Sequence, residues 1–187
     1  MNGGPQHLVV HATLDASYAN GPGRRCVIWL QGCKANCPGC FNQQIRSFSG
    51  GQQWSLERVL QWSTRTSALE GVTVTGGEPM LQAQALGALL RLLKEKLAWG
   101  TLIYSGWTVA EFMRAYYRYG FEGYLDAAIV GHYEALQSCG TGALSSSNQE
   151  LLLFTQRYSE ADFRIVPDCE IVVRTDGKVV KTGLRPV

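Results

Sequence analysis

The sequence lacks both a long apolar run and a long run of basic residues. No window reaches the roughly 18 uninterrupted apolar residues of a transmembrane helix, and the N-terminus has no basic start followed by an apolar core. A membrane span and a signal peptide are therefore not indicated, and the cytoplasm is the simplest location. The net charge is only +2, from 17 basic and 15 acidic residues. Because nucleic-acid-binding proteins usually concentrate positive charge, the sequence favours neither a nucleic-acid nor a membrane partner.

Internal repeats and low-complexity linkers are also absent. The chain has 187 residues, fewer than the roughly 250 of a typical eight-fold β/α barrel. Its hydrophobic fraction of 45% and charged fraction of 17% are typical of a globular protein. We therefore expect one domain over residues 1–187, with a core from about residue 18 to about residue 166.

Strand-like and helix-like segments alternate along most of the chain. Apolar, β-rich runs predict strands at 26–32, 71–75, 100–106 and 124–131. Helical spacing predicts helices over 55–69 and 81–99, and Thr108 with Glu111 forms a possible capping box at the start of a third helix. This alternation favours an α/β fold with parallel strands joined by right-handed crossovers.

The C-terminal segment has a different pattern. Residues 170–183, EIVVRTDGKVVKTG, form two alternating runs around Asp176 and Gly177, which is typical of a β-hairpin. We expect a hairpin over about 168–183, added to the α/β core, instead of another β/α unit.

Three of the six cysteines are clustered, and no fourth cysteine lies near them. Cys33, Cys37 and Cys40 have the spacing C-x3-C-x2-C. Thiolates are ligands for zinc and iron–sulfur clusters, and structural sites are normally closed by four ligands. A cluster held by three thiolates keeps one iron open, although the spacing alone also permits zinc or a chance grouping. The other cysteines are expected to be ordinary semi-buried thiols: Cys26, Cys139 and Cys169.

The segment TGGEP, residues 75–79, follows the second predicted strand. Gly76 and Gly77 allow close backbone approach, and the carboxylate of Glu78 can hold an ammonium group. Taken alone, the segment could be only a turn that starts the next helix. Because loops at the carboxyl ends of strands carry the chemistry in β/α folds, we expect this turn, the cysteine loop and Ser105 at the end of the third strand to face one another.

These motifs resemble those of a known family. The segment CKANCPGC resembles the CxxxCxxC motif of radical S-adenosylmethionine (SAM) enzymes, and GGEP looks like the family's motif for the methionine amino group. The longer stretch NGPGRRCVIWLQGCKANCPGCFN is similar to activating enzymes of glycyl radical enzymes, above all the activase of anaerobic ribonucleotide reductase. The stretch SSSNQ, residues 145–149, is similar to a late segment of that activase. The resemblance extends from about residue 18 to about residue 150.

The resemblance implies an incomplete β/α barrel of about five to six units, a [4Fe-4S] cluster, and SAM bound to the open iron. In this family the reduced cluster donates one electron to the sulfonium, which yields methionine and a 5′-deoxyadenosyl radical. In the activases, this radical removes a hydrogen atom from a glycine of a partner protein. The implied protein is thus an anaerobic radical SAM oxidoreductase with a glycyl radical enzyme as partner and a flavodoxin- or ferredoxin-type electron donor.

By position, the resemblance assigns cluster ligation and catalysis to Cys33, Cys37 and Cys40. It assigns contact with the cofactor to Gly39, Phe41, Gly76, Gly77, Glu78 and Pro79, and Ser105 joins them from its place at the end of a strand. Val130 and the residues before SSSNQ depart from the activase pattern, and they lie in segments that could contact the cofactor or the partner. Two alternatives therefore stay open: a stand-alone radical SAM enzyme that modifies a small molecule or peptide, and a non-enzymatic zinc or iron–sulfur module.

Overall fold

The computed structural model describes residues 6–139, 142–173 and 177–183. Its strands are β1 (His7–Ser17), β2 (Arg25–Leu30), β3 (Gln52–Ser55), β4 (Gly71–Gly76), β5 (Gly100–Ser105), β6 (Ala127–Val130), β7 (Glu150–Leu153), β8 (Cys169–Val173) and β9 (Val179–Gly183). Its helices are α1 (Leu56–Ser63), α2 (Ala83–Leu97), α3 (Val109–Arg118) and α4 (Glu160–Arg164), with short 3-10 helices η1 (Gln43–Ile45), η2 (Pro79–Gln82) and η3 (Ala135–Gln137). Within these ranges, no helix is long and apolar enough to cross a membrane.

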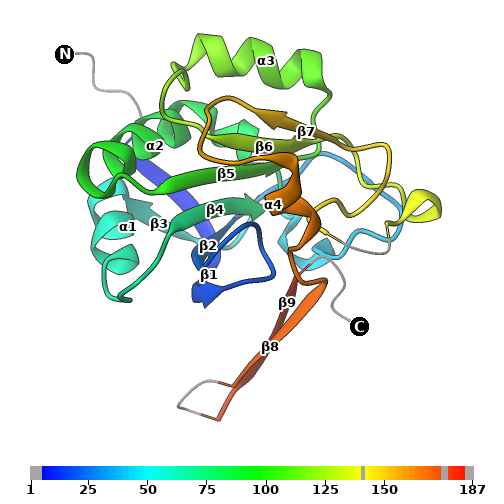
Figure 1. Cartoon of the computed structure of the whole chain (residues 1–187), viewed down its shortest axis with the longest axis horizontal. Coiled ribbons are helices and arrows are strands. Elements are labelled where there is room, and N and C mark those ends of the chain that lie inside the picture. The colour runs from blue at the N-terminus through cyan, green and yellow to red at the C-terminus, as the bar shows by residue number, and fades with distance from the viewer. Residues whose placement is uncertain (1–5, 140–141, 174–176, 184–187) are drawn as a thin grey trace.

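Within the described residues, seven of the strands form one sheet in the order β3-β1-β2-β4-β5-β6-β7 (Figure 1). The four central strands β2, β4, β5 and β6 are parallel neighbours. Helix α2 connects β4 to β5, and α3 connects β5 to β6. Parallel strands that are covered on both faces are usually apolar throughout, and the residues of β6, AAIV, are all buried.

The predicted mixture of strands and helices is confirmed, because each of the four predicted strands and each of the three predicted helices is present. The sheet is not parallel throughout. Strands β1 and β3 on one side and β7 on the other are antiparallel to their neighbours, so the described residues contain four parallel strands where five to six units were expected. Strand β1 also lies before residue 18, where the core was expected to begin.

Two apolar layers lie on opposite faces of this sheet. Side chains alternate across a strand, so Leu102 and Ile103 of β5 belong to different layers. The larger layer includes Ile103 and packs α1, α2 and α3 against the sheet through residues such as Val59, Leu90 and Phe112. The smaller layer joins the inner residues of β5 and β6 to α4 and its neighbours: Leu102, Ala127, Ile129, Ala143, Phe163 and Val166.

The helix starts follow the predicted capping residues. The Ser55 hydroxyl accepts a hydrogen bond from the Arg58 N–H at 3.1 Å, which caps α1. At α3, Thr108 and Glu111 form both hydrogen bonds of a capping box. The predicted starts of these two helices are therefore confirmed.

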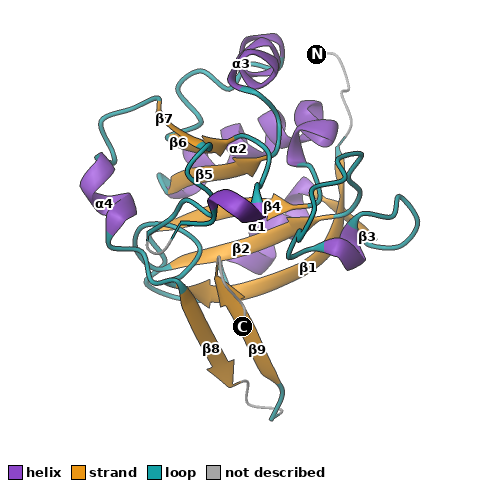
Figure 2. Cartoon of the chain, turned by 90° about the vertical axis from the view of Figure 1, so that its right-hand side faces the viewer, coloured by secondary structure: helices purple, strands orange, loops and turns teal. Residues whose placement is uncertain are grey.

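The predicted C-terminal hairpin is also confirmed. Strands β8 and β9 pair antiparallel and form a separate two-stranded sheet that projects from the body of the molecule (Figures 1 and 2). Of the two predicted turn residues, Gly177 has a φ of 80°, as such a turn requires, and Asp176 lies outside the described residues. The hairpin base contacts β1 through side chains, as described below.

Candidate active site

A cavity of about 450 Å³ lies at the carboxyl ends of the central strands. Its wall is formed by the loop after β2, the ends of β4 and β5, part of β1 and the end of β9. The structure brings most of the predicted site residues to this wall: Cys33, Cys37, Cys40, Phe41, Gly76, Gly77, Glu78 and Ser105. The expectation that the cysteine loop, the GGEP turn and the end of the third strand face one another is thus met by the geometry.

The cysteine loop leaves β2 at Gln31 and is closed by hydrogen bonds across its base. The N–H groups of Gly32 and Cys33 donate to the carbonyls of Ile45 and Arg46 at 2.9 and 3.0 Å. The side chain of Gln31 also donates to the carbonyl of Ile45 at 3.3 Å, and it is buried. The three cysteines are therefore carried on a loop whose two ends are held together at the sheet.

The three clustered cysteines are free, and each is partly exposed to the cavity. Partial burial raises the pKa of Cys33 and Cys37, and the other thiols nearby add to this rise. In the part of the chain that the structure describes, no three Cys, His, Asp or Glu side chains converge as a set that holds a metal ion. The three cysteines nevertheless fit an iron–sulfur cluster as ligands, because they are free of disulfides and line one cavity. Their raised pKa values do not oppose this role, since a bound metal cation deprotonates the thiols that ligate it.

Glu78 lies at the centre of a buried hydrogen-bond network between β4 and β5. Its carboxylate accepts hydrogen bonds from the Ser105 hydroxyl at 2.8 Å, the Gly106 N–H at 2.8 Å and the Met80 N–H at 2.9 Å. Burial raises the pKa of Glu78, and these three donors oppose the rise by stabilising the charged form. The carboxylate thus connects the ends of two strands while it also lines the cavity.

The two glycines of the GGEP turn lie against the neighbouring backbone. A Cβ atom at Gly76 would lie 2.4 Å from the Leu30 nitrogen, and one at Gly77 would lie 2.2 Å from the Gly32 carbonyl oxygen. The N–H groups of Gly77 and Glu78 donate to the carbonyls of Leu30 and Gly32, both at 2.8 Å. Glycine is therefore required here by close approach to the chain that leads into the cysteine loop.

Two of the predicted cofactor contacts are not part of the cavity wall. Gly39 has a φ of 73°, and a Cβ atom there would meet Ala135 at 3.2 Å. Pro79 is buried and occupies the first position of η2. The structure thus places Gly39 and Pro79 in the turns that shape the site. Phe41 does line the cavity and packs against the ring of Tyr133, with a centroid distance of 4.6 Å.

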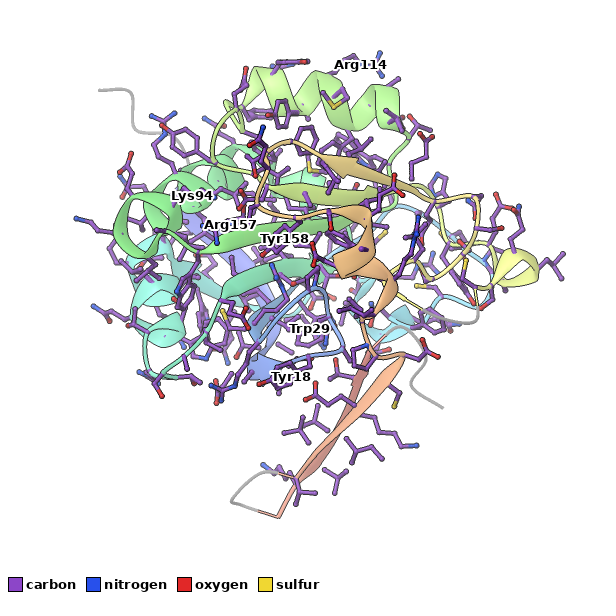
Figure 3. All side chains as sticks on the ribbon, viewed as in Figure 1. Tyr18, Trp29, Lys94, Arg114, Arg157 and Tyr158 are labelled. Carbon is purple, nitrogen blue, oxygen red and sulfur yellow. The ribbon has the colours of Figure 1, made fainter. Side chains whose placement is uncertain are left out.

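Several residues of the cavity wall were not predicted from the sequence. They come from β1, from the loop after β1, from the loop after β6 and from β9, and they include Thr13, Asn20, Tyr133, Lys181 and Thr182. Trp29 on β2, labelled in Figure 3, also belongs to the wall. No local spacing marks these residues, because only the tertiary fold brings the first strand and the last strand to the same cavity.

His132, which follows β6, lies beside the cysteines. Its Nδ1 atom is 3.7 Å from the Cys37 sulfur. The SSSNQ segment forms hydrogen bonds within itself and with the loop after β6. The Gln149 side chain accepts a hydrogen bond from the Ser145 N–H at 3.0 Å and donates one to the Gly131 carbonyl at 3.0 Å. This segment therefore holds the loop after β6 against the cavity.

A loop with three free cysteines at the carboxyl ends of parallel strands defines the class, an α/β protein with a cysteine-based site for an iron–sulfur cofactor. The sequence family described as 4Fe-4S single cluster domain matches residues 19–152 of this chain. This match includes the three cysteines, the GGEP turn and the SSSNQ segment.

Known proteins agree with this match. The anaerobic ribonucleoside-triphosphate reductase-activating protein of Vibrio cholerae serotype O1 is 28% identical over 157 residues, which cover 78% of this chain and 97% of that protein. The protein of the same name from Pasteurella multocida is 30% identical over 151 residues, covering 73% and 92%. The pyruvate formate-lyase-activating enzyme of Clostridium pasteurianum is 33% identical over 92 residues, covering 46% and 39%.

The chain belongs to the 4Fe-4S single cluster domain family and, within it, to the radical SAM activating proteins. The cofactors of this family are a [4Fe-4S] cluster and SAM, as the motifs indicated. Among solved structures, QueE from Escherichia coli aligns with a TM-score of 0.43 and 20% identity over 54% of this chain and 53% of that chain.

Proposed function

We propose that this protein activates an anaerobic ribonucleotide reductase by forming a glycyl radical on it. The observation that carries the proposal is the shared cavity, whose wall contains the three cysteines, the GGEP turn and the end of β5. The names of the relatives that align over nearly their whole length support the choice of partner. A glycyl radical enzyme is thus the proposed substrate.

Cys33, Cys37 and Cys40 are the proposed cluster ligands. When bound, a cluster would supply the single electron and SAM the cleavable carbon–sulfur bond for removal of a hydrogen atom from a glycine Cα of the partner. The chain's own residues hold the cofactors, orient them and exclude water. The loop closure at Gly32 and Ile45 keeps the cysteines beside the ends of β4 and β5.

Glu78 is the proposed partner of the SAM amino group. Its carboxylate lines the cavity and is kept in one orientation by Ser105, Gly106 and Met80. Gly76 and Gly77 act by bringing this turn close to the backbone of β2 and its continuation, and Pro79 and Gly39 act through the turns in which they lie. Phe41 and Tyr133 offer an apolar surface beside Cys40 on which a planar base can pack.

The proposal takes the chain as one radical SAM domain with the open β/α barrel of this family, of which β2, β4, β5 and β6 are the parallel part. It includes a flavodoxin- or ferredoxin-type donor, because the reaction requires a single electron from outside the chain. It also places the protein in the cytoplasm, where a reducing environment keeps cysteine ligands from forming disulfides.

Isotope transfer between the partner and the cofactor tests this proposal. The reductase subunit is prepared with glycine that carries deuterium on Cα and is incubated anaerobically with the reconstituted protein, SAM and reductant. We expect deuterium in the 5′-deoxyadenosine and a glycyl radical signal in the EPR spectrum of the reductase. Formation of unlabelled 5′-deoxyadenosine with no radical on the reductase would contradict the choice of partner. Zinc in place of iron in anaerobically purified protein would contradict the chemistry itself.

A further inference from the structure

The hydroxyl of Tyr104 is buried and has no hydrogen-bond partner among the described residues. Tyr104 lies on β5, one position before Ser105, and it is part of the cavity wall. Two other described side chains, Arg46 and Asn148, also have a buried polar atom without a partner. Neither of them lines the cavity. Among the described residues, Tyr104 is therefore the one that both lines the cavity and has a buried polar atom without a hydrogen-bond partner.

A buried hydroxyl without a partner is unfavourable, because it loses its hydrogen bonds to water and gains none in the protein. The Tyr104 ring packs against the smaller apolar layer, where phenylalanine would offer the same carbon surface. Native proteins satisfy most buried polar atoms, and an exception at a cavity wall points to a partner that comes with a ligand.

Other polar side chains of the cavity wall and of the sheet have hydrogen-bond partners within the protein. The Ser105 hydroxyl donates to Glu78, and the side-chain amide of Asn20 donates to Ser17 and Thr182 at 2.8 Å each. The guanidinium of Arg25, fully buried on the same face of the sheet, donates to protein acceptors: Pro22, Val72, Thr73, Gly100 and Tyr158. These contacts leave the Tyr104 hydroxyl as a donor that the protein does not use.

Tyr104 also keeps its proton under all ordinary conditions. Burial raises the pKa of Tyr104 far above its usual value, and the charge of Arg25 lowers it only in part. A protonated phenol that lacks a partner offers one O–H donor, and the natural partner for such a donor is an acceptor oxygen.

We propose that the Tyr104 hydroxyl donates a hydrogen bond to an acceptor oxygen of the molecule that fills the cavity. This inference rests on the proposed function, which supplies two molecules with such oxygens. One is SAM, through its ribose hydroxyls or carboxylate, and the other is the glycine-bearing peptide of the partner, through a backbone carbonyl. Tyr104 is thereby a binding residue of the reaction site, beyond the cysteine and GGEP motifs.

The substitution Tyr104→Phe tests the proposal because it removes only the hydroxyl. The matched control is Tyr158→Phe (Tyr158 is labelled in Figure 3), since the Tyr158 hydroxyl accepts a hydrogen bond from Arg25 at 3.0 Å and does not line the cavity. In the protein without cluster or SAM, we expect Tyr104→Phe to unfold at the same temperature as the wild type or a higher one. Tyr158→Phe should unfold at a lower temperature.

Binding then identifies the molecule that accepts the hydrogen bond. Equilibrium dialysis of SAM against the reconstituted proteins should show an affinity about fivefold to tenfold weaker for Tyr104→Phe, as expected for one neutral hydrogen bond, if SAM is the acceptor. If SAM affinity is unchanged and the KM for a peptide with the target glycine rises by a similar factor, the acceptor is the peptide. Either result supports the proposal.

Other results would overturn it. Unchanged SAM affinity together with unchanged KM would show that the hydroxyl binds neither molecule, while wild-type SAM cleavage would leave the proposed function intact. A loss of thermal stability as large as that of Tyr158→Phe would show that the hydroxyl has a partner within the protein or a fixed water. If the wild-type protein binds no SAM, the proposed function fails, and this inference fails with it.

Discussion

The glycines of the GGEP turn have a structural role that is separate from cofactor binding. Gly77 lies so close to Gly32 that a Cβ atom would come within 2.2 Å of a carbonyl oxygen. Backbone at this position cannot move aside without disturbing the hydrogen bond from Glu78 to Gly32. The turn and the cysteine loop are thus held together by contacts that exist before any cofactor binds.

We therefore expect Gly77→Ala to destabilise the protein even without cofactors, by about 1–3 kcal/mol, as overpacking usually does. Urea unfolding of the cluster-free protein measures this loss. Gly106→Ala is a matched control, because a Cβ atom there would lie 3.4 Å from the nearest atom, the Glu78 Oε2. Equal stability of the two variants would contradict the role given to Gly77.

The cysteines of the loop and the scattered cysteines differ in their surroundings. Cys37 lines the cavity, whereas Cys169 lies at the start of β8 and outside the cavity wall. We expect Cys37→Ala to lose cluster iron and all SAM cleavage, while Cys169→Ala keeps both. Iron and sulfide analysis with an assay for 5′-deoxyadenosine measures the difference. Equal loss in both variants would show that the ligands are misassigned.

The hairpin is the element that links the end of the chain to the cavity. The Glu170 carboxylate accepts hydrogen bonds from the Ser17 hydroxyl at 2.6 Å and the Tyr18 N–H at 3.0 Å. The buried Thr182 hydroxyl accepts from Asn20 at 2.8 Å. These contacts hold β8 against the end of β1 and β9 against the loop that follows β1, so that the hairpin base closes one side of the cavity.

We expect Glu170→Ala to loosen the hairpin base and to speed amide exchange in β9. Hydrogen–deuterium exchange, read on peptides over 177–183, measures this effect. Glu160→Ala is the control, because Glu160 pairs with Arg164 in an exposed contact within α4. Unchanged exchange in Glu170→Ala would mean that the hairpin is held by other contacts.

Local patterns predicted some elements and could not predict others. The runs that became β2, β4, β5 and β6 are short and apolar because both faces of these strands are covered. Strand β1 escaped prediction because irregularities in its pairing, between Val10 and Ala12 and between Leu14 and Ser17, break its alternating pattern. Strands β3 and β7 have four residues each, as β6 has, but theirs are exposed or only partly buried, so neither strand forms a fully buried apolar run.

A buried charge also stabilises the fold at the amino end of β6, whereas the cavity lies at the carboxyl ends of the strands. Asp126 lies 2.7 Å from the Lys94 amine and 3.6 Å from Arg157. Burial alone would raise the pKa of Asp126, but hydrogen bonds from Lys94, Thr155 and Thr101 outweigh it, so the pKa is lowered. A lowered pKa means that the folded protein binds this proton more weakly than the unfolded chain does.

Asp126 therefore stabilises the fold above the pKa of an unfolded aspartate, about 3.9, and this contribution is lost as the pH falls through the lower pKa of the folded state. We expect Asp126→Asn to cost about 1.5–3 kcal/mol at neutral pH. Thermal unfolding of the cluster-free protein from pH 7 to pH 3 should show the two proteins converge at acid pH. A constant difference across this range would contradict the charged state assigned to Asp126.

For the molecule as a whole, the sequence predicted those site residues that belong to motifs, and it did not predict the site residues that only the tertiary fold brings to the cavity. The spacing of Cys33, Cys37 and Cys40 and the GGEP turn identify chemistry that requires fixed neighbours along the chain. The other half consists of residues such as Asn20, Tyr133 and Thr182, which meet only after β1 and β9 come together at the cavity. Their side chains are ordinary, so no pattern along the chain distinguishes them.

Low-temperature EPR of the anaerobically purified, dithionite-reduced protein, with and without SAM, is the most direct test for an open iron at this cavity. We expect a [4Fe-4S]⁺ signal that changes when SAM is added, because three cysteine ligands leave one iron open for the cofactor. The same samples should then release 5′-deoxyadenosine. A protein with bound zinc and no cluster signal, or a cluster signal that SAM does not alter, would contradict an open iron at this cavity.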